Sequence, residues 1–180
     1  MDINTYTLPQ TLLEDISTTE STSEIDKLYN SLIDEYYNVF LNVMKYEELE
    51  EGYLSKSEVL YKEIAKKYGY VLASNFINAI YKYGIQNNDL KILLSILKII
   101  SNISNKNEID NFSIIAISLL RFNNAEIIDE AISCFEKWGR KSDAELLKNF
   151  EEPSQKWLSE YYRETISYLE GLEWVIMLGK

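Results

Sequence analysis

The residue types that most often carry out catalysis are scarce in this chain. It has no histidine and one cysteine, Cys134, beside 29 aspartates and glutamates among 180 residues. Without histidine, it lacks the usual general base and the usual partner that activates a serine or cysteine nucleophile. It also has no glycine-rich loop with the spacing that binds nucleotide phosphates. Acid–base chemistry would therefore have to come from carboxylates alone.

Carboxylate pairs can hydrolyse glycosides, but no pair in this sequence has surroundings that would tune a pKa. The run EELEE at 47–51 lacks the alternating ligands and the turning glycine of an EF-hand loop, so we expect a solvated acidic helix end. Cys134 lies in an apolar helical stripe with Ala131 and Trp138, which indicates a buried structural thiol. We predict a protein that is not an enzyme and that has no cofactor or metal.

The acidity of the chain is concentrated at its start. The net charge is −11, and residues 1–60 contain thirteen Asp and Glu against three Lys, whereas residues 61–180 are nearly balanced. Such a field repels nucleic acid and anionic membranes, and it accelerates encounter with a cationic protein. Two interpretations stay open: an acidic surface for a basic partner, or acidity that only keeps the protein in solution.

Apolar residues recur at intervals of three and four along most of the chain, which predicts a single all-α domain over 1–180. We expect a short helix and polar linker over 1–23, with Ser23 capping the next helix, and an acidic helical region over 24–56. Helix pairs should follow over 57–169. An apolar tail over 170–180 should either cap the last pair or pair with another copy of the chain.

Three glycines, Gly69, Gly84 and Gly139, each follow an apolar stripe, and two come directly after Lys-Tyr while Gly139 follows Lys-Trp. This position predicts a left-handed helix cap, which favours glycine because it has no Cβ. The segment 89–101 is apolar almost all round and 110–122 is nearly as apolar. We expect these two segments to form the centre of the molecule.

Residues 123–169 resemble a HEAT-like repeat, whose units are antiparallel helix pairs stacked into a solenoid. The matching features are the polar turn at 123–124, the Ala131-Ile132 pair, Trp138-Gly139 ahead of Asp143, and Trp157-Leu158 after the break at Pro153. The resemblance implies a short HEAT-like α-solenoid over 57–169. Because the repeat spacing is irregular, a compact irregular helical bundle is the alternative.

Small acidic helical-repeat proteins of this type resemble the immunity proteins of bacterial polymorphic toxin and contact-dependent growth inhibition systems. The resemblance implies a monomer that forms a heterodimer with a cognate toxin domain, often a cationic nuclease, and covers its active site or substrate surface. The absence of a signal peptide or membrane-spanning segment and the single cysteine predict a cytoplasmic location. The alternatives are a helical-repeat adaptor for a non-toxin partner and an acidic mimic of nucleic acid.

We expect the partner-facing surface within residues 24–53. Its charges and its aromatic or apolar anchors would be Asp26, Asp34, Glu35, Tyr37, Leu41, Glu47, Glu48, Glu50, Glu51 and Tyr53. The alternative is that these carboxylates are merely solvated and that Tyr37 packs within the fold. Trp157 and Tyr161 form a second candidate patch, which could instead pack on the preceding helix.

Overall fold

The computed structural model describes residues 10–49 and 52–177, and side chains over 23–49 and 52–172; all regular structure in this part of the chain is α-helical. This confirms the all-α class. The helices are α1 (Gln10–Tyr46), α2 (Lys56–Tyr68), α3 (Tyr70–Asn87), α4 (Leu90–Ser101), α5 (Lys106–Leu119), α6 (Ala125–Trp138), α7 (Lys141–Lys148) and α8 (Lys156–Met177).

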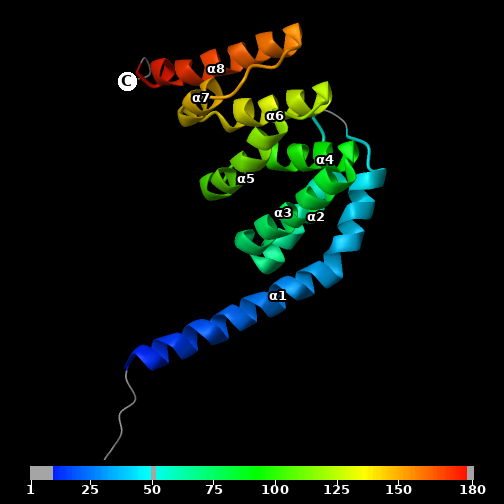
Figure 1. The fold of residues 1–180 in the computed structure, drawn as a ribbon, viewed down its shortest axis with the longest axis vertical. Helices are drawn as coiled ribbons and strands as arrows, with labels where there is room; N and C mark the ends of the chain where they lie inside the picture. The colour runs from blue at the N-terminus through cyan, green and yellow to red at the C-terminus, as the bar shows by residue number, and fades with distance from the viewer. Residues whose placement is uncertain (1–9, 50–51, 178–180) are drawn as a thin grey trace, which may run out of the picture.

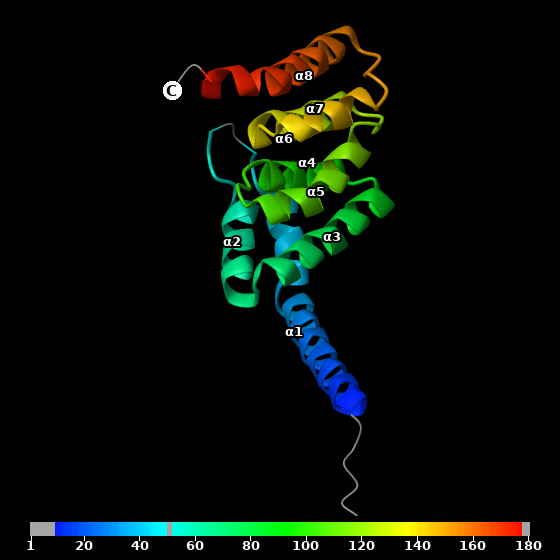
Figure 2. The same cartoon turned by 90° about the vertical axis from the view of Figure 1, so that its left-hand side faces the viewer.

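The helices lie in successive layers: α2 with α3, α4 with α5, then α6, and α7 packed against α8 at the far end (Figure 1). Each layer contacts the next, through α2 with α4, α4 with α6, and α6 with α8. The first pair is turned relative to the later layers (Figure 2). Stacking buries the apolar faces that each pair leaves open on its own.

The central helix is α4, as its sequence predicts. It contacts α1, α2, α3, α5 and α6, and Leu93, Ile96, Leu97 and Ile100 are fully buried. The prediction that the segment 110–122 shares this position is only partly right. Helix α5 is covered on one side, and Ile114 on its other side is 72% exposed.

Helix α1 runs without interruption through residues 17–23, so the predicted polar linker and the predicted cap at Ser23 are wrong. Serine and threonine cost only a fraction of a kcal/mol each within a helix, and no glycine or proline occurs between residues 10 and 46. The second half of α1 packs on the stack and buries Leu32, Phe40 and Met44. Its first half extends beyond the helix pairs (Figure 1).

The three glycines play two different roles. Gly69 and Gly139 have positive φ at +85° and +57° and follow α2 and α6. Gly139 is left-handed as predicted, whereas Gly69 combines its positive φ with an extended ψ of 156°. Gly84 instead lies inside α3, which ends at a left-handed Asn88. A Cβ on Gly84 would come within 2.9 Å of Leu93 Cδ2. Glycine at this position therefore allows α3 and α4 to approach closely.

The end of the chain continues α8 as far as Met177 instead of forming a separate tail after residue 169. Side chains beyond residue 172 lie outside the described part. The two roles predicted for this segment, capping the last layer or pairing with another copy of the chain, stay predictions.

Candidate partner-binding surface

Glu47 belongs to the fold and not to an exposed acidic surface. It is 4% exposed, and its carboxylate accepts hydrogen bonds from the Ser57 backbone N–H at 2.9 Å and from the Ser57 hydroxyl at 2.6 Å. Ser57 is in the first turn of α2, where backbone N–H groups have no partner within the helix. The prediction that Glu47 contacts a partner is wrong, because its oxygens already hold the start of α2.

Glu35 is exposed, but its charge is compensated. Lys67 of α2 donates to both of its carboxylate oxygens at 2.7 Å, and the Tyr68 hydroxyl donates to one of them at 2.7 Å. Hydrogen bonds from Lys67 and then from Tyr68 lower the pKa of Glu35. The Lys67 ammonium also lies 5.4 Å from the ring centre of Tyr36. Glu35 therefore joins α1 to α2 and adds little negative field.

Tyr37 and Leu41 are partly buried against the core. The Tyr37 ring packs edge-on against Tyr83 of α3, with ring centres 6.5 Å apart. Both residues therefore serve the packing of α1, which is the alternative that the sequence left open for Tyr37.

Four of the predicted residues, Asp26, Asp34, Glu48 and Tyr53, are exposed. Glu50 and Glu51 lie outside the described residues. Asp26 and Asp34, together with the neighbouring Glu24, form no ion pair with any residue in the described ranges. Among the described residues, the predicted carboxylates that are exposed and form no ion pair are thus Asp26 and Asp34 on α1 and Glu48 just after it.

Two exposed large apolar side chains lie beside these carboxylates on α1. Ile25 and Leu28 are 54% and 50% exposed, although they continue the stripe that is buried from Leu32 onward. They are exposed because α1 has passed the edge of the stack at this point. Other exposed large apolar side chains are spread along the chain from α1 to the start of α3: Val39, Tyr46, Tyr53, Leu54, Val59, Tyr70 and Val71.

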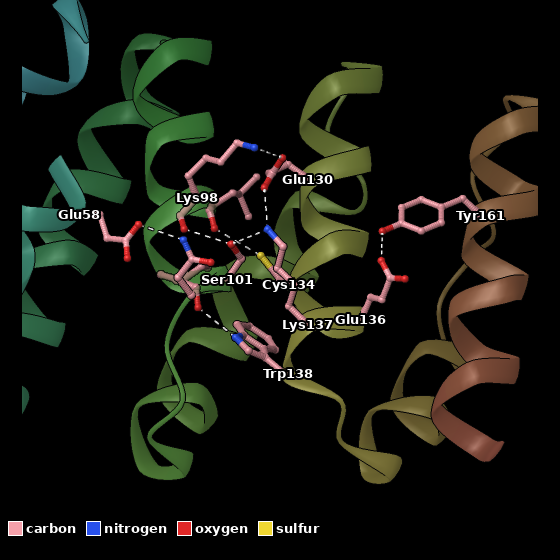
Figure 3. Close-up of polar contacts among 12 residues, drawn as sticks. Glu58, Lys98, Ser101, Glu130, Cys134, Glu136, Lys137, Trp138 and Tyr161 are labelled. Atoms are coloured by element: carbon pink, nitrogen blue, oxygen red, sulfur yellow. Dashed lines mark hydrogen bonds and ion pairs between the residues drawn. The ribbon is translucent and has the colours of Figure 1, made fainter. Parts of the chain in front are cut away.

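A polar network joins α4 to α6 (Figure 3). Glu130 of α6 lies 3.3 Å from the Lys98 ammonium and 3.9 Å from the Lys137 ammonium. Lys137 also donates to the Ser101 hydroxyl at 3.3 Å. Each of these charges has an opposite partner within the network, so the cluster fixes the two helices against each other.

Two buried side chains of α6 reach carbonyl groups of α4 (Figure 3). The Trp138 indole N–H donates to the Ile100 carbonyl at 3.0 Å, and the Cys134 thiol lies 3.6 Å from the Leu97 carbonyl. Burial raises the pKa of the Cys134 thiol well above its usual value. Cys134 is therefore a packed thiol and not a nucleophile.

The second candidate patch divides into two parts. The Tyr161 hydroxyl of α8 donates to Glu136 of α6 at 2.5 Å (Figure 3), so Tyr161 packs on the preceding layer. Trp157 remains 51% exposed. A single exposed aromatic is ordinary for a protein surface.

A cavity of about 420 Å³ lies between α2, the end of α4 and the start of α5, and it was not predicted from the sequence. On its wall the Tyr61 hydroxyl donates to Glu108 at 2.8 Å, and both residues are buried. Glu58 on the same wall accepts from Lys62 at 2.8 Å and from Asn102 at 2.9 Å. The position of Glu58 could have been predicted from the sequence. Ser55 and Glu58 have the spacing of a capping box, which places both residues at the start of a helix.

The Tyr61–Glu108 pair spans 47 positions, and no local spacing could have signalled it. In the described ranges, no three His, Cys, Asp or Glu side chains come together as a metal site would require. No helix there is long and apolar enough to cross a bilayer. No protein-family model matches the chain, and no curated protein matches it.

Proposed function

We propose that this chain is an immunity protein that binds a cognate toxin domain with a basic surface and neutralises it by covering its active site or substrate surface. The observation that carries the proposal is the composition of the solvent-facing side of α1 over residues 24–34. This segment combines three uncompensated exposed carboxylates, Glu24, Asp26 and Asp34, with the exposed apolar Ile25 and Leu28.

The charge and the shape of α1 suit a basic partner. The helix contains seven acidic residues and two lysines, and its first half stands clear of the stack (Figure 1). A nuclease presents a positive cleft to phosphates. An acidic helix can be steered into such a cleft, and apolar side chains that become buried there then slow dissociation.

The test uses the toxin domain encoded directly upstream, because an immunity gene follows its toxin gene. Co-expression of this chain should restore the growth of cells that produce the toxin domain. The double variant Asp26→Asn/Asp34→Asn should lower the association rate and weaken its salt dependence. The variant Ile25→Ser/Leu28→Ser should mainly raise the dissociation rate. Glu164→Gln, at an exposed position on α8, is the control and should change neither rate.

Two outcomes would contradict the proposal: no rescue of growth by the wild-type chain, or binding that neither double variant alters. A stable complex with a host protein that is not a toxin, in place of the toxin domain, would favour the adaptor alternative. Similar affinity for many DNA-binding proteins would favour the mimic of nucleic acid.

A further inference from the structure

The cavity between α2, α4 and α5 has the make-up of a small-molecule site. Its volume is about 420 Å³, and its apolar walls include Ala65, Ile99, Ile103 and the ring of Tyr70. Ligand sites in proteins typically combine hundreds of Å³ of largely apolar lining with a few fixed polar groups. No residue of α1 lines this cavity, so it is separate from the proposed toxin-binding surface.

Glu108 is a buried carboxyl group without a cation. It is 5% exposed, and the hydrogen bond to its side chain in the described structure comes from the neutral Tyr61 hydroxyl at 2.8 Å. No Lys or Arg of the described ranges forms an ion pair with it. Buried carboxylates are ordinarily paired. Glu58 on the same wall follows this rule, because Lys62 lies 2.8 Å away.

The cavity also has a cation without a partner. Lys66 lines it, is exposed to solvent and makes no ion pair with any described residue. The neighbouring Lys62 differs, because Glu58 already neutralises it. The cavity therefore offers one uncompensated anion at depth, one uncompensated cation on its solvent side, and apolar walls.

We propose that this cavity binds a zwitterion of amino-acid size with an apolar side chain. Its primary ammonium group pairs with Glu108, and its carboxylate pairs with Lys66. Its apolar part packs against Ala65, Ile99 and Ile103. Such a ligand supplies both missing charges at once and replaces the water that covers the apolar wall.

Three compounds that share one carbon chain test the assignment by calorimetric titration of the full chain. Norleucine carries both charged groups, pentylamine only the cation, and hexanoate only the anion. Norleucine should bind roughly tenfold more tightly than pentylamine, since a contact of about 1.4 kcal/mol changes affinity by that factor. Hexanoate should bind most weakly, because its carboxylate can pair with Lys66 but it leaves the buried Glu108 without a cation.

Variants separate the two contacts. Glu108→Gln keeps an oxygen for the Tyr61 hydroxyl and should weaken both norleucine and pentylamine by roughly tenfold or more. Lys66→Gln should remove the advantage of norleucine while leaving pentylamine unchanged. Lys56→Gln, on the same helix but outside the cavity, is the matched control.

The proposal is overturned if hexanoate binds as well as norleucine, if none of the three compounds binds at millimolar concentration, or if Glu108→Gln leaves affinity unchanged. Circular dichroism shows whether each variant is folded. None of these results bears on toxin binding, because no residue of α1 lines the cavity.

Discussion

Glu47 and Ser57 form a two-point contact in which the backbone N–H and the hydroxyl of Ser57 both donate to one carboxylate, at 2.9 and 2.6 Å. The contact joins the segment after α1 to the first turn of α2. The Ser55 hydroxyl accepts from the Glu58 N–H of the same turn at 3.1 Å. The start of α2 is thus held by its own cap and by a residue from the preceding segment.

Removing this contact should destabilise the fold. Glu47→Ala leaves the Ser57 N–H and hydroxyl without their buried partner, and hydrogen bonds to charged groups contribute about 2 kcal/mol each. Because two such bonds are lost and the Ser57 hydroxyl keeps the Ser55 hydroxyl at 3.0 Å, we expect the free energy of unfolding in urea to fall by about 2–4 kcal/mol. Glu48→Ala, at the adjacent exposed position, should change it little. Equal losses in the two variants would show that the Glu47 contact does not stabilise α2.

Gly84→Ala should also be destabilising, although alanine is usually preferred to glycine inside a helix by about 1 kcal/mol. The new Cβ would meet Leu93 Cδ2 at 2.9 Å and Ile92 Cγ2 at 3.2 Å. Leu93 is fully buried, so it cannot move aside freely, and overpacking of this kind costs about 1–3 kcal/mol.

Gly171→Ala is the matched control for Gly84, because a Cβ at Gly171 in α8 would meet nothing within 4 Å. It should raise the melting temperature, whereas Gly84→Ala should lower it. A higher melting temperature for both variants would mean that Leu93 and Ile92 of α4 can shift to accommodate the new Cβ at little cost.

The stability of the protein should depend on pH through Glu108. Burial raises the pKa of this carboxyl group, and the hydrogen bond from Tyr61 offsets only part of the effect. The folded chain then holds the proton of Glu108 at a pH where the unfolded chain has lost it, so stability falls as pH rises through this interval.

Glu108→Gln removes that dependence. The variant should gain stability relative to wild type as the pH rises from about 4 toward neutrality, measured as the difference in the free energy of unfolding. Glu63→Gln, at an exposed position on α2, should show no such trend. A difference between Glu108→Gln and wild type that stays constant with pH would contradict the assignment.

Cys134 should not react with thiol reagents in the native protein. It is fully buried, and the raised pKa of its thiol leaves little of the reactive thiolate. We expect modification by a disulfide-exchange reagent to be slow in buffer and fast in urea. Rapid modification of the folded chain would show that α6 separates from α4.

Local sequence was sufficient for those features that depend on a few neighbouring residues. The spacing of apolar residues indicated an all-α fold, and the apolar circumference of 89–101 identified the central helix α4, whose Leu93 and Ile96 are fully buried. The positive φ of Gly139 followed from its place after a helix. These features depend on backbone preference and on the face that one helix buries.

Tertiary structure decided which charged residues have an ion-pair partner and which glycine lies against a neighbouring helix. Gly84 has the same local signature as Gly139, yet it lies inside α3, where Leu93 of α4 occupies the space that a Cβ would need. Glu35 has the same charge as Asp34, yet Lys67, 32 positions away, pairs with it. An ion pair or a close approach between helices depends on how whole layers are placed. That placement follows from the summed packing of all the apolar faces, which no single segment contains.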